Sequence, residues 1–239
     1  MSSMLEVHHL RKSYGDKVAV QDLSFHVPRG SITAFLGPNG AGKTTTLRMI
    51  LGLLRRDQGA IHIDGHDVDV HPEIIYQQTG YVPDSPNVYS HLTGREFLTF
   101  VAELRRIKLS PEAVQQRLEE FGLKGHEDYL ASTYSLGMKK RLMLAAALLH
   151  NPSLLILDEP TSGLDPVGIR FLKDLLRKVT AGGGAVLMST HLLPSAQEVA
   201  DRVLIIHKGR LLLETELTEV LRTGGNLEET FMSLINIPA

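Results

Sequence analysis

The sequence predicts an α/β fold in which a mostly parallel core sheet is joined by an antiparallel side sheet and a helical sub-lobe. Short apolar runs alternate with helical patterns through much of the chain, which is typical of a parallel sheet covered by helices. Near the N-terminus polar and apolar residues alternate instead, which favours antiparallel strands. We therefore expect one domain over residues 1–239, with a core from 1–92 and 151–215, a helical sub-lobe at 93–150 and a helical tail at 216–239.

The first elements are predicted from short runs bounded by turn residues. Met4–Leu10, Val18–Val27 and Gly59–Asp64 have the pattern of antiparallel strands. Ser31–Gly37 is a continuous apolar run that ends in a Gly-rich loop, and Thr44–Leu54 then has the apolar spacing of a helix. The order strand, loop, helix is therefore expected here.

The later part of the core repeats strand and helix. Apolar runs at Leu154–Leu157, Ala185–Met188 and Arg202–Ile206 predict buried strands, and the segments Pro166–Thr180 and Leu193–Ala200 between them have helical patterns. Because successive strands joined by helices run in the same direction, we expect these strands to belong to the parallel sheet.

The segment from Thr93 to His150 lacks strand patterns and is predicted to be helical. Ser110, followed by a proline and a glutamate, has the composition of a helix start. At the other end of the chain, Gly224–Ala239 has the spacing of a short amphipathic helix that packs on the body of the protein.

Composition excludes several classes of function. The chain has no cysteine, which excludes disulfides and thiolate metal sites, and its formal net charge of -2 gives no basic field for nucleic acid, so no nucleic-acid partner is expected. The polar N-terminus does not resemble a signal peptide, and the longest apolar run, Leu142–Leu149, is far shorter than the roughly 20 residues that span a bilayer.

Two groups of charged or titratable residues are interpreted as ordinary surface. The 11 histidines lack the spacing of metal ligands, and His8 and His9 are predicted to point to opposite faces of a strand. The basic runs Arg55–Arg56, Arg105–Lys108 and Lys139–Arg141 are short, so we expect them to lie on solvated helix faces.

The Gly-rich loop after the first buried strand matches a phosphate-binding motif in full. Glycines allow backbone amides to approach phosphate closely, and the following helix adds favourable partial charge. The match and its position between a strand and a helix predict a P-loop that binds the phosphates of a nucleotide. Lys43 is expected to reach the β- and γ-phosphates, and Thr44 to place its hydroxyl on Mg²⁺. The predicted loop consists of Gly37, Pro38, Asn39, Gly40, Ala41, Gly42, Lys43, Thr44 and the following Thr45.

Two carboxylates follow the apolar strand Leu154–Leu157. Ligands in open α/β sheets bind at the carboxyl ends of the strands, where these residues lie. Asp158 is therefore expected on the Mg²⁺ side, and Glu159 is the candidate base or water-orienting group for attack on the γ-phosphate.

The stretch from Tyr134 to Asp165, YSLGMKKRLMLAAALLHNPSLLILDEPTSGLD, resembles the signature, Walker B and D-loop run of ATP-binding cassette (ABC) ATPases. The resemblance extends from about Leu5 to at least Lys208. It implies that Tyr14 stacks on adenine and that His191 contacts the γ-phosphate and the catalytic water. It further implies that Ser135 and Gly137 contact the ATP of a second subunit, and it assigns Asp165 to the D-loop.

The sequence departs from the family pattern at two places. The usual signature is L-S-G-G-Q, whereas here Leu136 replaces a glycine, which requires a negative φ, and Met138 replaces a glutamine, which removes an amide. Asp84 stands where glutamine is usual in the Q-loop. An aspartate can still ligate Mg²⁺ but has no NH₂ donor, so altered sensing of the γ-phosphate is expected.

The resemblance also implies partners. We expect a homodimer closed around two ATP–Mg²⁺ that drives a separate membrane permease, docked near Asp84–Glu96, and that lies at the cytoplasmic face of the membrane through this permease. An export-type bacterial system is the preferred interpretation. Two alternatives remain, a soluble ABC mechanoenzyme acting on nucleic acid or ribosomes and a P-loop kinase outside the family. The kinase would leave the signature-like stretch and His191 unexplained.

Overall fold

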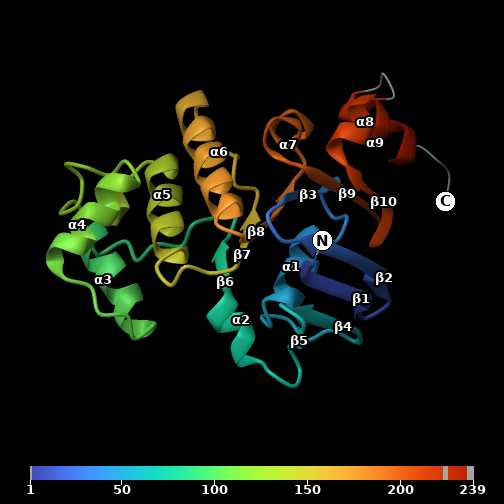
Figure 1. Cartoon of the computed structure of the whole chain (residues 1–239), viewed down its shortest axis with the longest axis horizontal. Coiled ribbons are helices and arrows are strands. Elements are labelled where there is room, and N and C mark those ends of the chain that lie inside the picture. The colour runs from blue at the N-terminus through green and yellow to red at the C-terminus, as the bar shows by residue number, and fades with distance from the viewer. Residues whose placement is uncertain (1, 223–225, 236–239) are drawn as a thin grey trace.

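Two sheets organise the protein. The computed structural model describes residues 2–222 and 226–235 (Figure 1). One sheet has four strands in the order β2-β1-β4-β5, and the other has six in the order β10-β9-β3-β8-β7-β6. In the second sheet β6, β7, β8, β3 and β9 are parallel, and β10 alone pairs antiparallel. The predicted fold class, with a mostly parallel sheet and an antiparallel side sheet, is confirmed.

The antiparallel sheet contains the strands predicted near the N-terminus. Its strands are β1 (Ser3–Tyr14), β2 (Lys17–Pro28), β4 (Gln58–Ile63) and β5 (His66–Asp67). One local prediction was wrong. His8 and His9 are both exposed, because the pairing of β1 with β2 shifts register between Val7 and Leu10 and His9 has a φ of 48°. Such a bulge breaks the alternation of side chains between the two faces.

The six-stranded sheet lies at the centre. Its strands are β3 (Ile32–Leu36), β6 (Thr79–Val82), β7 (Leu154–Asp158), β8 (Ala185–Thr190), β9 (Arg202–His207) and β10 (Arg210–Glu216). Every residue of β3, β7 and β8 is buried. Strands covered on both faces need apolar residues at successive positions, which explains their continuous apolar runs.

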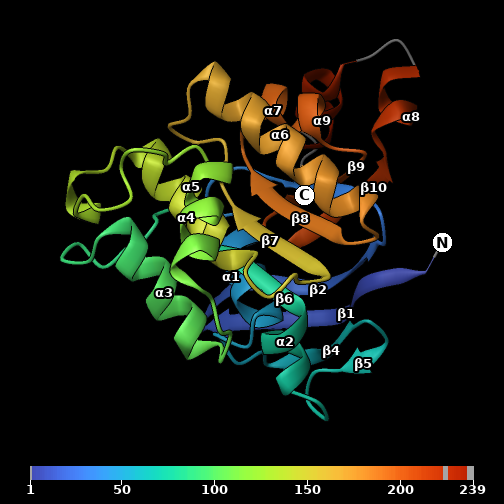
Figure 2. The ribbon, with the colours of Figure 1, turned by 60° about the vertical axis from the view of Figure 1, so that its left-hand side comes forward.

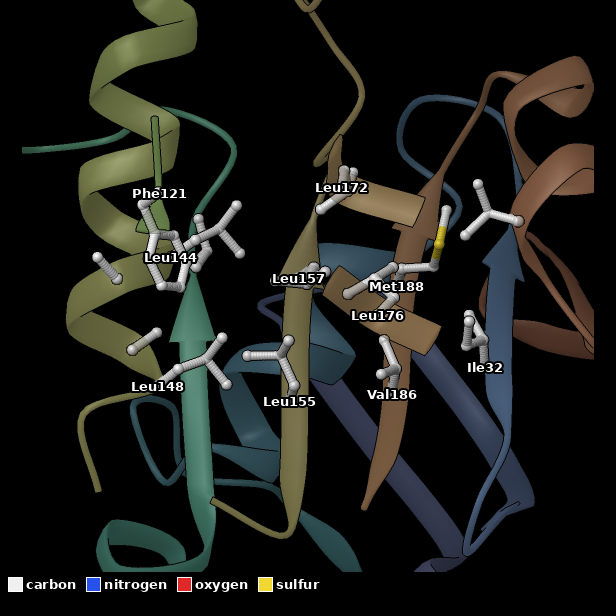
Figure 3. Packing of buried hydrophobic residues seen from close by; sticks show 14 of the residues in the cluster. Ile32, Phe121, Leu144, Leu148, Leu155, Leu157, Leu172, Leu176, Val186 and Met188 are labelled. Atoms are coloured by element: carbon white, nitrogen blue, oxygen red, sulfur yellow. The ribbon is translucent and has the colours of Figure 1, made fainter. Parts of the chain in front are cut away.

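Each face of this sheet is covered by a different layer. On one face, Leu47 and Ile50 of α1 pack together with the apolar side of the antiparallel sheet. On the other face lie α5 (Leu136–Ala147) and α6 (Pro166–Ala181) (Figure 2), whose residues Leu144 and Leu172 belong to the buried cluster on the sheet (Figure 3). Outside the helical segment 93–150, the helices are α1 (Lys43–Ile50), α2 (Glu73–Gln78), α6 (Pro166–Ala181), α7 (Leu193–Val199), α8 (Leu217–Arg222) and α9 (Leu227–Ile235).

The segment between Thr93 and His150 is helical, as predicted, and lies at one end of the molecule (Figure 1). Thr93 forms a capping box with Glu96, and the side chains of Ser110 and Ser135 cap the next two α-helices. Its elements are α3 (Gly94–Leu104), α4 (Pro111–Glu120), the 3₁₀ turn η1 (Ala131–Thr133) and α5 (Leu136–Ala147).

Some boundaries differ from the predictions. The first helix ends at Ile50 rather than Leu54, because the chain turns at Gly52, whose φ is 68°. The helix α2 and the strand β10 were not predicted. In the predicted tail, α9 buries Leu227 and Phe231 against the body, while residues 224–225 and 236–239 lie outside the described part of the chain.

Candidate nucleotide-binding and hydrolytic site

The predicted phosphate loop joins the central strand β3 to the start of α1. Two of its glycines are required by local geometry. A Cβ on Gly42, whose φ is 109°, would lie 2.6 Å from the carbonyl oxygen of Ala19, and a Cβ on Gly37 would lie 2.5 Å from that of Ile206. The loop is therefore pressed closely against neighbouring strands, and only glycine fits at these two positions.

Lys43 lies at the centre of this loop with its ammonium turned inward. Its Nζ donates to the carbonyl oxygen of Gly37 at 2.7 Å and lies 3.7 Å from Oε1 of Glu159. Burial lowers the pKa of Lys43, and the carboxylates of Glu159 and Asp158 oppose this by raising it. The two acids therefore help to keep a buried lysine in its charged form, the form that attracts phosphate.

Asp158 is held from two sides at the end of β7. Its Oδ2 accepts a hydrogen bond from Thr44 Oγ1 at 3.0 Å, and its Oδ1 accepts a short one from Ser189 Oγ. Asp158 and Ser189 are register partners on the adjacent parallel strands β7 and β8. The sheet thus fixes the carboxylate against the first turn of α1.

Glu159 leaves the strand in an unusual backbone conformation and is bound by the residues that end β8. Its φ is 47°, a region that non-glycine residues rarely adopt. The carboxylate accepts from Thr190 Oγ1 at 3.0 Å, and its Oε1 is 2.9 Å from Nδ1 of His191. Glu159 and His191 therefore form a pair, with the histidine as an outer partner of the acid.

A cavity of about 730 Å³ brings most of the predicted site together. Tyr14, half exposed at the end of β1, forms one wall, and Asp84 and Asn87 form another. The predicted residues that line it are Tyr14, Pro38, Asn39, Gly40, Ala41, Gly42, Lys43, Thr44, Thr45, Asp84, Asp158 and Glu159.

The donor atoms present fit a hard divalent cation. Thr44 Oγ1 and Asp158 Oδ2 are 3.0 Å apart beside the cavity, and Mg²⁺ prefers a few protein oxygens with phosphate and water completing its shell. Across residues 2–222 and 226–235, no group of three or more His, Cys, Asp or Glu side chains could hold a metal. Within these residues Asp84 has no hydrogen bond or ion pair to Thr44 or Asp158, so its role as a metal ligand stays a prediction.

Five predicted site residues do not line this cavity, namely Gly37, Ser135, Gly137, Asp165 and His191. Ser135 caps α5 by accepting from the amide of Met138 at 3.2 Å, and Gly137 lies in the first turn of that helix. Leu136 also belongs to this helical turn, as its predicted negative φ requires. Asp165 caps α6 by accepting from the amide of Gly168 at 2.7 Å. The cavity therefore contains the phosphate loop and the acids without the signature-like residues.

The structure adds residues that the sequence analysis did not assign to the site. Ser189 and Thr190 hold the two acids, and the signal for them is the pair of polar residues that ends a wholly buried strand. Lys17 and Arg48 also line the cavity and bring positive charge to it.

One surface prediction was wrong. Lys140 was expected on a solvated helix face, but it is 2% exposed and its Nζ donates to carbonyl oxygens of the loop that follows Asp158. Its neighbour Lys139 is only partly buried.

Comparisons with known proteins agree with this geometry. A family model described as "ABC transporter" matches residues 20–162. The chain is 38% identical to the bacitracin transport ATP-binding protein BcrA of Enterococcus faecalis over 92% of this chain and 71% of that protein. It is 32% identical to the lantibiotic transport ATP-binding protein SrtF of Streptococcus pyogenes over 97% of both chains. A solved structure of an ATP-binding subunit of an ABC transporter superposes with a TM-score of 0.88 at 34% identity, covering 97% of this chain and 99% of that one.

Among the described residues, none of the helices combines the length and the apolar character needed to cross a bilayer.

Proposed function

Because the chain belongs to the ABC transporter family as an ATP-hydrolysing subunit, we propose that two copies close around two ATP–Mg²⁺ and drive a separate membrane permease. ABC ATPases work with a permease at the cytoplasmic side of a membrane, and we place this subunit there. The single domain of residues 1–239 would combine the core at 1–92 and 151–215 with the helical sub-lobe at 93–150 and the tail at 216–239.

Nucleotide binding is assigned to the residues of the cavity. Tyr14 stacks on adenine, since its ring is half exposed at the cavity wall. The amides of the phosphate loop and the ammonium of Lys43 hold the phosphates. Thr44 and Asp158 would hold Mg²⁺, which when bound neutralises charge on the phosphate oxygens.

Hydrolysis is assigned to the pair formed by Glu159 and His191. The Glu159 carboxylate orients a water and takes its proton as the water oxygen attacks the γ-phosphorus, while the bond from that phosphorus to the bridging oxygen breaks and ADP leaves. Thr190 and His191 hold this carboxylate, and Lys43 neutralises negative charge on the phosphate that leaves. Asp84 is proposed as the sensor of the γ-phosphate. If Asp84→Ala left the ATPase rate and its response to the permease unchanged, this last role would be wrong.

The proposal rests mainly on one observation, which is that the signature residues lie outside the nucleotide cavity of their own chain. Ser135 and Leu136 are exposed, and none of the residues Ser135–Met138 lines the cavity that contains Lys43. A second copy, related by a two-fold axis, can bring its own Ser135 and Gly137 to the ATP bound by the first. Each ATP then lies between two subunits, and hydrolysis loosens the dimer.

The permease is proposed to dock beside the segment Asp84–Glu96, a loop that leads into the first turn of α3. Tyr89, in this loop, is half exposed, and its ring centroid lies 5.4 Å from that of Phe100. Next to it, an apolar groove of about 520 Å³ runs between α2 and α3, lined by Tyr76, Phe97 and Val101 among others. A short amphipathic helix from the permease fits a groove of this character. Co-purification with a multi-span membrane protein tests this docking site. It should be lost in Val101→Glu and kept in the control Leu212→Glu, which lies far from the groove.

The direction of transport is proposed from the relatives. Two relatives that resemble this chain are named for the transport of bacitracin and of a lantibiotic. We infer an exporter of compounds of this class.

Glu159→Gln tests the shared site directly. The variant keeps the size and hydrogen-bonding capacity of residue 159 but cannot take a proton, so it should bind ATP, stop hydrolysing and accumulate as an ATP-bound dimer. Light scattering at saturating ATP–Mg²⁺ measures this, with the exposed helix residue Glu103→Gln as a matched control that stays active. A Glu159→Gln protein that remains monomeric would contradict the shared site, and specific binding to DNA or ribosomes would favour the mechanoenzyme instead.

A further inference from the structure

We propose that Lys140 is a positioning residue for hydrolysis. From the signature helix α5 its side chain holds the loop Glu159–Leu164. Binding of the signature to a partner's ATP is thereby transmitted to Glu159 of the same subunit. This inference rests on the proposed dimer. In that dimer, the Lys140 side chain of one subunit would link the ATP bound by its own subunit to the ATP bound by the partner.

Within the described part of the chain, the hydrogen bonds of the Lys140 ammonium all go to this loop. Its Nζ donates to the carbonyl oxygens of Ser162 at 2.6 Å, Glu159 at 2.8 Å and Pro160 at 3.4 Å. Across residues 2–222 and 226–235, no carboxylate forms a salt bridge with it. A buried ammonium without a carboxylate partner is costly unless its three donors are satisfied, and here three carbonyls match three donors. A neutral side chain would avoid the cost of burying a charge. We therefore assign to the charge the role of holding the three carbonyl groups of the loop together.

The loop needs such support because Glu159 has an unfavourable backbone conformation. With a φ of 47°, its peptide geometry persists only if the surroundings fix it. The amide of Glu159 donates to the carbonyl oxygen of Ser189 at 3.0 Å, which holds it to the sheet. Its carbonyl oxygen accepts from Lys140, which holds it to α5. If the second bond is lost, the carboxylate can move away from Thr190 and Lys43.

The first turn of α5 packs on the same loop. A Cβ at Gly163, whose φ is 71°, would collide with the side chain of Leu136, and a Cβ at Gly137 would lie 3.6 Å from Cδ2 of Leu164. Leu136 thus lies against the loop of its own subunit. The helix that carries the signature and the loop that carries Glu159 are therefore packed directly against each other.

The charge state of Lys140 gives this role a distinctive signature. Burial lowers the pKa of Lys140, and the carboxylates of Asp84 and Glu159 oppose this by raising it. The ammonium is the active form, so kcat should fall at alkaline pH as the amine loses its proton. An arginine keeps its charge to much higher pH, so Lys140→Arg should shift this fall upward.

Three variants test the proposal. Lys140→Met keeps the apolar stem and removes the donor, and it should lower kcat by roughly 10- to 100-fold, the size expected for a misplaced catalytic group. Binding of a fluorescent ATP analogue should be unchanged, and the Lys140→Met, Glu159→Gln double variant should still form the ATP-bound dimer. Lys140→Arg should keep measurable turnover with the shifted pH profile. The control Lys139→Met, at the neighbouring position on α5, should behave as wild type.

Several results would overturn the inference. A wild-type kcat in Lys140→Met would do so, as would a loss of ATP binding equal to the loss of turnover. If Lys140→Met does not fold, an unshifted pH profile in Lys140→Arg refutes the role. If Glu159→Gln alone stays monomeric, the proposed dimer fails, whereas an intact dimer with full turnover in Lys140→Met refutes only the role of Lys140.

Discussion

Two regions of the molecule are built in opposite ways. One is the hydrolytic region at the carboxyl ends of β7 and β8, and the other is the signature at the start of α5. At the strand ends, Asp158 accepts hydrogen bonds from Thr44 and Ser189, and Glu159 accepts from Thr190 and lies against His191. At the start of α5, Ser135 caps its own helix, and Ser135 and Leu136 are both exposed.

The difference lies in what the single chain can complete. The parallel register that pairs Asp158 with Ser189 fixes the carboxylate at the end of β7 through contacts within the chain, which is the preorganisation that catalysis needs. The signature helix start is positioned by its cap, but it does not line the cavity of its own subunit. One region is therefore assembled within a single chain, and the other is the one that we propose to function against a second copy.

The largest effect is expected when each region is disabled in a different copy. Lys43→Met removes the central ammonium of the phosphate site. Gly137→Asp places a negative charge toward the partner's phosphate, and its Cβ meets Leu164 at an ordinary 3.6 Å, so the fold is kept. Each variant alone should lose roughly 100-fold or more in turnover. A 1:1 mixture should recover up to about a quarter of wild-type activity, since half of the pairs then contain one complete site of two.

A second mixture provides the matched control. Lys43→Met combined with Glu159→Gln disables the same region in both copies, so every pair lacks a complete site and no activity should return. ATP hydrolysis in subunit-exchanged mixtures measures both cases. Equal turnover in the two mixtures would contradict the division of the site between subunits.

A smaller effect is expected within the hydrolytic region. Ser189→Ala removes the buried donor to Asp158, which should lower kcat roughly tenfold and cost about 1–3 kcal/mol of unfolding free energy. Ser153→Ala removes a similar bond, to Gln78 at 2.6 Å, away from the cavity, and should leave kcat unchanged. Steady-state ATPase rates and denaturant unfolding report the two quantities. Unchanged turnover in Ser189→Ala would show that Asp158 does not need this support.

Fold prediction succeeded where local pattern and burial agree. The strands β3, β7 and β8 are covered on both faces, so their apolar runs predict them directly. Strand β10 lies at the sheet edge with mixed burial, and α2 has six residues and no buried position, so neither gives a strong periodic signal. The bulge at His9 was not predictable, because register shifts depend on pairing with another strand.

The residues of the site that belong to recognisable sequence motifs could be predicted, and the others could not. Lys43, Thr44, Asp158 and Glu159 belong to local sequence patterns, and the fold brings them into one cavity. Lys140 could not be found in this way, because a lysine in a basic run normally extends into solvent. Its acceptors are backbone carbonyls 19 to 22 residues away, which have no side-chain signal.

The smallest effect is expected from repairing the signature. Met138→Gln restores the amide of the common pattern in the first turn of α5, where it can reach the partner's nucleotide. One added hydrogen bond is worth about 1 kcal/mol, so the ATP concentration that half-dimerises the Glu159→Gln protein should fall about fivefold. With position 159 intact, kcat at saturating ATP should stay constant, since the hydrolytic region is already complete. Light scattering across an ATP titration measures the midpoint, with the exposed Met232→Gln on α9 as control. If Met138→Gln instead changed kcat and left the midpoint in place, the signature would act on the chemical step. The contrast between a hydrolytic region that one chain assembles and a signature that only binds the partner's ATP would then be wrong.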